Sequence, residues 1–183
     1  MRGVVQIASP NCDARPPGVE ADLIVVHGIS LPPGEFGGPW IDRLFTNSLP
    51  SEVHPYFEEI GDLKVSSHLS VRRNGDLTQY VKFTDRAWHA GKSQFEGREA
   101  CNDFSIGIEL EGTDTLAYDA AQYRALARAI AALCAAYPRL SADRVVGHSD
   151  IAPGRKTDPG PAFDWRHARG LIARACAHLL HRT

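Results

Sequence analysis

Residues 23–28 read LIVVHG, a continuous apolar run that stops at His27 and Gly28. A short run rich in β-branched residues predicts a strand buried inside a sheet. A second strand is predicted at 105–111, SIGIELE, where isoleucine and leucine alternate with Glu109 and Glu111. Because successive side chains of a strand point to opposite faces, both glutamates share the face opposite the apolar residues.

Further strands are predicted on either side of this pair. Residues 145–148, VVGH, form a short apolar run that again ends in a histidine. Residues 65–81 predict a hairpin, because apolar and polar residues alternate on both sides of Asn74-Gly75, a strong two-residue turn signal.

Helices are predicted between and after these strands. Apolar residues recur at helical spacing over 119–137, and Pro138 marks the end of that helix. A last helix is predicted from a cap at Asp164 to about residue 181, and a short one at 40–45. Strands that alternate with helices, together with one hairpin, predict an α/β fold with a mixed central sheet flanked by helices.

Length and composition predict one domain, 1–183, with 1–20 as a surface lead-in segment. Twenty basic and 22 acidic side chains leave a net charge of −2, which argues against a nucleic-acid partner. No apolar stretch predicts a membrane span or a secretion signal, so we expect a cytoplasmic protein without a membrane partner. The four cysteines are then expected to be free thiols.

Two of the predicted strands end in histidine, and the ends of adjacent strands are where open sheets collect ligand groups. Asp158 follows His148 by ten residues in a loop rich in proline and glycine. Two imidazoles and a carboxylate make a plausible zinc site with one position open to water. The alternative is that His27 and His148 are bonded to backbone and Asp158 is a turn residue.

Glu109 and Lys156 are the candidates for acid–base and charge chemistry. A carboxylate among apolar neighbours tends to have a raised pKa, as a general base beside a metal requires. Lys156 lies two residues before Asp158, in the same loop. The alternatives are that Glu109 lies on a solvated sheet face beside Glu111, and that Lys156 is a solvated loop residue.

Four long motifs resemble the type-2 N-acetylmuramoyl-L-alanine amidases, a family that includes the peptidoglycan recognition proteins. They read HGISLPPGEFGG (27–38), RAWHAG (86–91), CNDFSIGIELEG (101–112) and HSDIAPGRKTDPG (148–160). The similarity runs nearly end to end, from Ser9-Pro10 to Asp164-Trp165. The resemblance implies the same mixed sheet flanked by helices.

The resemblance also implies roles for single residues. Zinc would be held by His27, His148 and Asp158, with Glu109 as general base and Lys156 as transition-state stabiliser. The sequence departs from the family at Gly28, where close relatives are expected to have Asn, which affects the expectation of one side-chain contact in the substrate groove but not the metal site.

For the groove itself we consider three residues: Trp40, Lys64 and Trp88. Aromatic rings can pack on a sugar face and basic groups can meet peptide carboxylates. Core packing is the alternative for at least one tryptophan.

The implied function is a zinc-dependent amidase that cuts the bond between the lactyl group of (1,6-anhydro-)N-acetylmuramic acid and L-alanine in muropeptides, during cytoplasmic peptidoglycan recycling. We expect a monomer with a small-molecule substrate. The alternatives are an amidase acting on intact peptidoglycan and a non-catalytic muropeptide-binding module. A binding module would be expected to have lost zinc ligands, whereas all three ligand positions are present here.

Overall fold

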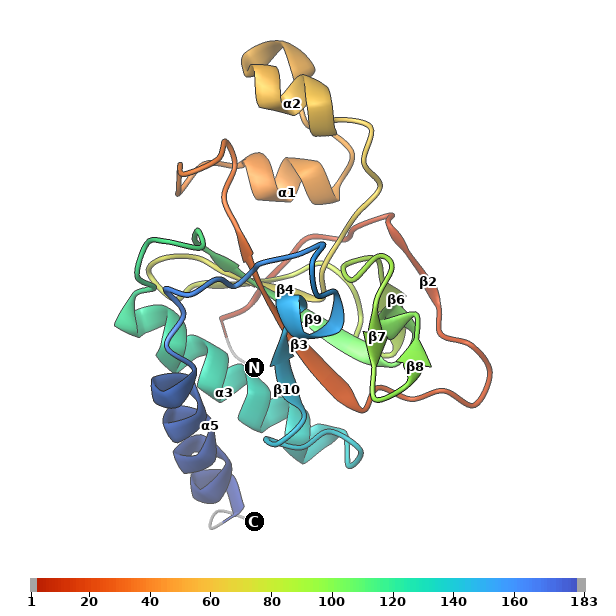
Figure 1. The fold of residues 1–183 in the computed structure, drawn as a ribbon, viewed down its shortest axis with the longest axis vertical. Helices are drawn as coiled ribbons and strands as arrows, with labels where there is room; N and C mark the ends of the chain where they lie inside the picture. The colour runs from red at the N-terminus through yellow and green to blue at the C-terminus, as the bar shows by residue number, and fades with distance from the viewer. Residues whose placement is uncertain (1–2, 181–183) are drawn as a thin grey trace.

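The computed structural model describes residues 3–180 and is built around a six-stranded sheet in the order β1-β5-β4-β9-β3-β10 (Figure 1). Its strands are β1 (Val5–Gln6), β3 (Leu23–Ile29), β4 (Leu69–Val71), β5 (Leu77–Gln79), β9 (Ser105–Glu111) and β10 (Val145–Gly147). Only the hairpin pair β4 and β5 is antiparallel, and the other neighbouring strands are parallel. The predicted mixed sheet and its hairpin are confirmed, but the hairpin strands are shorter than the predicted 65–81. Because Arg72 donates its N–H to the Asp76 carbonyl at 2.9 Å, the loop holds the three residues 73–75 rather than two.

The other elements surround this sheet. Two small antiparallel pairs are β2 (Cys12–Ala14) with β6 (Asp85–Ala87), and β7 (Gln94–Phe95) with β8 (Arg98–Glu99). The α-helices are α1 (Trp40–Phe45), α2 (Pro55–Ile60), α3 (Ala120–Ala136), α4 (His148–Ile151) and α5 (Trp165–Leu180), and short 3₁₀ turns occur at Ser51–Val53 and Cys101–Asp103.

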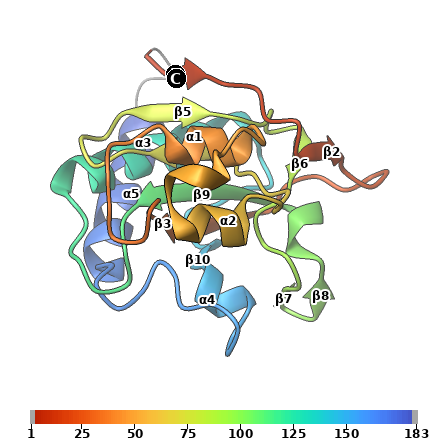
Figure 2. The same ribbon diagram turned by 90° about the horizontal axis from the view of Figure 1, so that it is seen from above.

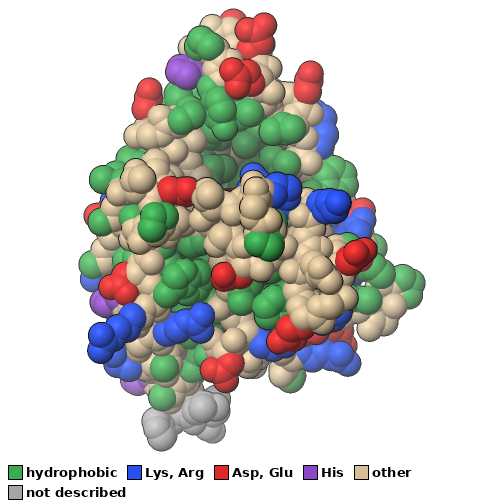
Figure 3. Space-filling model, viewed as in Figure 1, with side chains coloured by type: hydrophobic (Ala, Val, Ile, Leu, Met, Phe, Trp, Pro, Cys, Tyr) green, Lys and Arg blue, Asp and Glu red, His purple; other side chains and the backbone are tan. Residues whose placement is uncertain are grey.

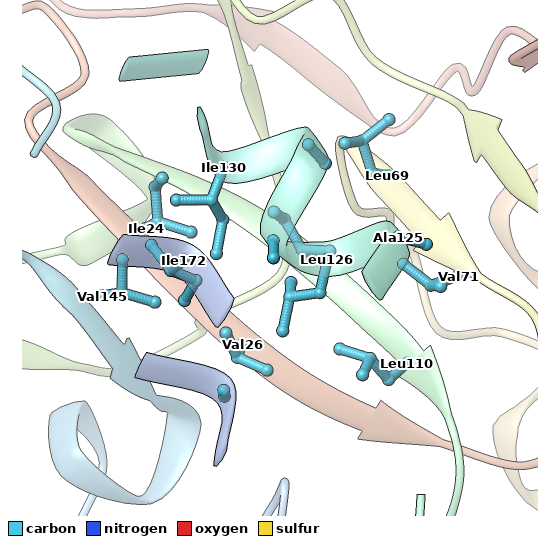
Figure 4. Packing of buried hydrophobic residues seen from close by; sticks show 14 of the residues in the cluster. Ile24, Val26, Leu69, Val71, Leu110, Ala125, Leu126, Ile130, Val145 and Ile172 are labelled. Carbon is cyan, nitrogen blue, oxygen red and sulfur yellow. The ribbon is translucent and has the colours of Figure 1, made fainter. Parts of the chain in front are cut away.

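Helices α3 and α5 pack side by side on one face of the sheet (Figures 1 and 2). Figure 4 shows Leu126 and Ile130 of α3 and Ile172 of α5 against Ile24 and Val26 of β3, all of them buried. Because side chains alternate along β3, Leu23 and Val25 point to the other face, into a second cluster with Ile151 of α4, and His27 shares that face.

Both predicted ends of α3 and the predicted start of α5 agree with the structure. Helix α3 stops before Pro138, and its first turn is capped by the Gln122 side chain, which accepts from the backbone N–H of Asp119 at 3.0 Å. Asp164 caps α5, since its carboxylate accepts from the backbone N–H of His167 at 2.8 Å. Residue 181, the predicted end of this helix, lies outside the described residues.

Helices α1 and α2 stand beyond the carboxyl end of β3, away from α3 and α5 (Figure 1). Short helix α1 is confirmed at the predicted residues, and Ile41, Leu44 and Phe45 are buried on its inner face. Helix α2 was not predicted, because six residues carry too little periodicity. Its Phe57 and Ile60 pack in the same small cluster as Phe45.

Two segments differ from their predicted form. His148 does not end a strand but begins α4, because the Asp150 carboxylate accepts from the backbone N–H of Gly147 at 2.7 Å and turns the chain into a helix. The lead-in segment is mostly exposed, as expected, but β1 pairs with β5 and β2 pairs with β6. Within residues 3–180, no helix has both the length and the apolar character needed to cross a membrane.

Buried His68 supports the backbone of β9. Its Nδ1 accepts from the N–H of Gly107 at 3.0 Å, and its Nε2 lies 3.1 Å from the Asp85 carbonyl. Burial, and next the nearby Arg15 cation, lower the pKa of His68 to about 3. The folded protein therefore holds His68 neutral at a pH where the unfolded chain would protonate it.

We expect this difference to destabilise the metal-free protein as the pH falls below about 6.5, the ordinary histidine pKa. Because the pKa of His68 is lower in the folded protein than in the unfolded chain, the unfolded chain takes up the proton first as the pH falls. His68 alone then lowers the free energy of unfolding by about 1.4 kcal/mol per pH unit. Urea unfolding at several pH values should show a shallower slope for His68→Asn, which keeps an acceptor for Gly107 but does not titrate. Equal slopes in both proteins would contradict the expectation.

Candidate active site

Strand pairing brings the predicted site residues together at the carboxyl ends of three parallel strands. In the register of β3 and β9, His27 is the partner of Glu109. In the register of β10 and β3, Gly147 is the partner of Val26, so the next residue, His148, reaches His27. This is the edge of a parallel sheet where ligand groups usually gather.

Three side-chain atoms converge there. His27 Nδ1 lies 2.9 Å from His148 Nδ1 and 3.2 Å from Asp158 Oδ2, and His148 Nδ1 lies 3.1 Å from the same oxygen. The loop that carries Asp158 is tied to α4, because the Asp158 carbonyl accepts from the N–H of Ser149 at 3.0 Å. Two imidazoles and one carboxylate from distant parts of the chain thus face a single point.

The charges of these groups suit a cation. Burial lowers the pKa of His27 to about 4, so this imidazole is neutral. Burial acts to raise the pKa of Asp158, but the two neighbouring imidazoles, His148 first and then His27, outweigh it and hold that pKa well below its usual range. A carboxylate with two imidazole nitrogens is a donor set typical of a divalent metal ion, and this cluster could hold one.

Glu109 lies beside the three donors. It is only 8% exposed, and its Oε2 is buried without a hydrogen-bond partner among the described residues. Burial, and next the Asp158 carboxylate, raise the pKa of Glu109 well above its ordinary value, and Lys156 partly opposes this. The alternative of a solvated sheet face is wrong, because Glu109 and Glu111 are both buried.

Lys156 approaches the same point from the loop before Asp158. It is exposed, and its backbone N–H donates to the Ala152 carbonyl at 3.0 Å. It lines the same cavity as the three donors, and its positive charge partly opposes the raised pKa of Glu109.

A cavity of about 450 Å³ opens over these groups and is lined by His27, Glu109, His148, Lys156 and Asp158. Its other wall is apolar and comes from the segment that carries α1 and α2, with lining residues Leu31, Leu44, Phe45, Tyr56, Ile60, Leu63 and Val65. Figure 3 shows hydrophobic side chains gathered over this part of the molecule. The cavity therefore has a polar, reactive floor and an apolar wall.

The structure does not bring the three groove candidates to this cavity. Trp40 packs on Phe57, with ring centroids 5.2 Å apart. Lys64 is exposed, although its neighbours on both sides line the cavity. Trp88 donates its indole N–H to Asp13 at 3.2 Å. Apolar residues of the segment that carries α1 and α2 line the cavity instead of these three candidates. The short helix predicted at 40–45 was the only sequence signal for that apolar wall.

Gly28 has a steric explanation. A Cβ at this position would overlap the hydroxyl of Tyr118, which donates to the Pro159 carbonyl at 3.0 Å. Tyr118 thus fills the space beside residue 28 and also holds the loop that follows Asp158. In this chain, a larger residue at position 28 would require Tyr118 to move.

Comparison with known proteins shows the family of this chain. The sequence model of the family described as N-acetylmuramoyl-L-alanine amidase matches residues 17–161. The 1,6-anhydro-N-acetylmuramyl-L-alanine amidase AmpD of Salmonella typhimurium strain SL1344 is 60% identical over 168 residues, covering 92% of this chain and 89% of that protein.

Two solved structures show the same architecture. A crystal structure of a selenomethionine derivative of AmpD superposes with a TM-score of 0.91 at 56% identity, covering 94% of this chain and 96% of that chain. The amidase AmiD of Escherichia coli, in complex with the substrate anhydro-N-acetylmuramic acid-L-Ala-D-γ-Glu-L-Lys, superposes with a TM-score of 0.60 at 29% identity, covering 93% of this chain and 61% of that chain.

Proposed function

Because this chain belongs to the N-acetylmuramoyl-L-alanine amidase family and is an amide hydrolase, we propose that it cuts the bond between the lactyl group of 1,6-anhydro-N-acetylmuramic acid and L-alanine. The substrates are soluble muropeptides released during peptidoglycan recycling. One observation carries the proposal: His27, His148 and Asp158 converge at the floor of a cavity that Glu109 also lines, and Glu109 Oε2 has no hydrogen-bond partner in residues 3–180.

The metal in this proposal is zinc, which His27, His148 and Asp158 would hold. The mixed nitrogen and oxygen donors fit this ion, and three protein ligands are typical of a catalytic rather than a structural zinc site. A bound zinc ion supplies a Lewis acid that makes water more acidic and withdraws electron density from an amide carbonyl.

Glu109 moves the proton. Its Oε2 takes a proton from the attacking water, whose oxygen forms the new bond to the lactyl carbonyl carbon. When the carbon–nitrogen bond breaks, Glu109 gives that proton to the nitrogen of L-alanine, which leaves as a free amine. Burial keeps Glu109 more basic than an exposed carboxylate, which suits both transfers.

Lys156 stabilises the charge that develops on the carbonyl oxygen during the attack. An ammonium aimed at that position gains most in the transition state, because the ground-state carbonyl carries little charge. The apolar wall opposite excludes water from part of the substrate and strengthens these interactions.

The proposal extends to compartment and partners. The enzyme acts as a monomer in the cytoplasm, on a small-molecule substrate, without nucleic acid. Support comes from the four cysteines, which are free thiols as a reducing compartment would keep them, and from the slightly negative net charge.

The test compares two substrates by mass spectrometry. We expect the protein to release L-alanyl peptides from soluble anhydro-muropeptides, to act poorly on intact sacculi, and to lose activity with a metal chelator. Equal rates on both substrates would favour a general wall amidase. Tight binding of muropeptide without cleavage, in zinc-loaded protein, would favour a binding module.

A ligand variant tests the metal directly. His148→Ala removes one of three donors and leaves a buried cavity in its place, so we expect the purified variant to contain little zinc and to have almost no activity. Elemental analysis of the wild type and the variant, prepared side by side, measures this. The assignment would be wrong if the variant held one zinc ion per chain.

A further inference from the structure

The segment Trp88-His89-Ala90-Gly91 lies behind the metal-binding cluster, and the proposed mechanism gives it no role. His89 is buried, and its Nδ1 lies 2.9 Å from Nε2 of His27, on the side of that ring turned away from Asp158. The two rings meet edge to face, with centroids 5.0 Å apart. His89 therefore touches a metal-binding residue without facing the metal position.

A chain of hydrogen bonds determines which nitrogen of His89 carries its proton. The Ser105 hydroxyl donates its single proton to the Cys101 carbonyl, so it must accept from His89 Nε2, 3.1 Å away. His89 is buried, and the partners of its two ring nitrogens among the described residues are His27 and Ser105, neither of which is a carboxylate that would stabilise a second proton. His89 Nδ1 is then an acceptor and presents its lone pair to His27.

The consequence reaches His27. Its Nε2 must carry a proton in order to donate to His89 Nδ1, and in a neutral ring this leaves Nδ1 with a free lone pair. That Nδ1 is the atom that faces His148 and Asp158. The chain from Ser105 through His89 thus prepares His27 as a metal ligand before any metal arrives.

The next residue does the same for His148. The Ala90 carbonyl lies 3.2 Å from His148 Nε2 and can only accept, so His148 carries its proton there and turns the Nδ1 lone pair to the cluster. Two consecutive residues therefore select the protonation pattern of both imidazoles.

Three features hold this segment in place. The Asn102 side-chain oxygen accepts from the N–H groups of His89 and Ala90, at 3.1 and 2.8 Å. The Arg155 guanidinium donates to the Ala90 carbonyl at 2.6 Å. Gly107 of β9 leaves room for the ring, since a Cβ there would lie 2.5 Å from Cγ of His89. Such support indicates that the position of the His89 ring is specified rather than incidental.

We propose that His89 is a positioning residue which, by accepting from Nε2–H of His27, selects the tautomer that offers Nδ1 to the metal. The inference rests on the proposed function for the presence of zinc, but the tautomer itself is a property of the metal-free protein. Partners that orient a metal-binding histidine usually contribute about 10- to 100-fold in metal affinity.

The direct measurement is the nitrogen-15 NMR spectrum of the imidazoles in chelator-treated, metal-free protein. In the wild type we expect His27 to be protonated at Nε2. A His27 protonated at Nδ1 would overturn the proposal, whatever any variant does. If His27 has the expected tautomer but the protein binds no zinc, the proposed metal is wrong and the role of His89 stands.

Variants then test the role of His89 in metal binding. His89→Phe keeps a ring but removes the acceptor, and zinc affinity measured by chelator competition should fall about 10- to 100-fold. His89→Asn places an amide oxygen near the Nδ1 position and should restore most of that affinity. Unchanged zinc affinity and an unchanged His27 tautomer in His89→Phe would refute the proposal.

Two further variants separate positioning from general stability. His68→Asn alters another buried imidazole, whose ring centroid lies 5.8 Å from that of His89 and whose nitrogens contact the Gly107 N–H, the Asp85 carbonyl and the Arg15 side chain. It should leave zinc affinity unchanged. If His89→Phe does not fold, Ser105→Ala replaces it, because it removes the acceptor for His89 Nε2–H while keeping the ring. Ser105→Ala should weaken zinc binding and give a mixture of His27 tautomers. A wild-type zinc affinity together with a wild-type His27 tautomer in this variant would count against the proposal.

Discussion

Glu109→Gln is expected to lower kcat by about 10²- to 10⁴-fold, the usual contribution of a positioned general acid–base group. Glutamine has nearly the same size, so the buried position should be kept, but it cannot take a proton from water. Zinc content should stay at the wild-type value, because Glu109 is not one of the three converging donors. The comparison variant is Asp158→Ala, in which zinc and activity should be lost together.

The pH profile gives a second readout for Glu109. The base must be unprotonated to act, so kcat/KM of the wild type should fall as the pH drops through the raised pKa of this group. That acid limb should be absent from the residual activity of Glu109→Gln. Glu20→Gln changes an exposed carboxylate paired with Arg139 and should keep both rate and profile. If Glu109→Gln kept a wild-type rate, another group would have to be the base.

Lys156→Ala is expected to lower kcat by about 10²- to 10³-fold, or about 2.7–4 kcal/mol, by analogy with the loss of one donor to a developing oxyanion. KM should change much less, because the substrate carbonyl carries little charge before the attack. Lys156→Arg should recover only part of the rate, since a planar guanidinium does not place its charge as an ammonium does.

Steady-state kinetics and zinc content measured on the same preparations decide the role of Lys156. All three donors remain in Lys156→Ala, so its zinc content should equal that of the wild type. Lys92→Ala is the matched control, because Lys92 is an exposed loop lysine that does not line the cavity. If kcat of Lys156→Ala were close to the wild-type value, Lys156 would be only a solvated loop residue without a catalytic role.

The fold could be predicted from the sequence where a local pattern was long enough. Helix α3 and strand β9 have sustained periodicity, and their boundaries agree with the structure within a residue or two. Helix α2 and the pair β7 and β8 are too short for such a pattern. They are stabilised by contacts with distant residues, such as the packing of Phe57 in one cluster with Phe45.

From spacing alone, the cluster of His27, His148 and Asp158 was one of two alternatives, because two predicted strands end in histidine and the ends of neighbouring strands meet at one edge of a sheet. The resemblance to the amidase family selected this alternative. The assignment of the cluster as a zinc site remains a proposal. The burial of Glu109 was only one of two alternatives, because a strand pattern tells which residues share a face but not whether that face is covered. Here the segment that carries α1 and α2 forms the wall opposite Glu109.

By itself, then, the sequence determined the strands, the long helices and the residues at the strand ends, because these depend on spacing along the chain. Tertiary structure alone decided the groups around them: the apolar wall of the cavity, the unpartnered oxygen of Glu109, and the contact of His89 with His27. These depend on how separate segments pack, and a hydrogen bond between residues 62 positions apart leaves no periodic trace in the sequence.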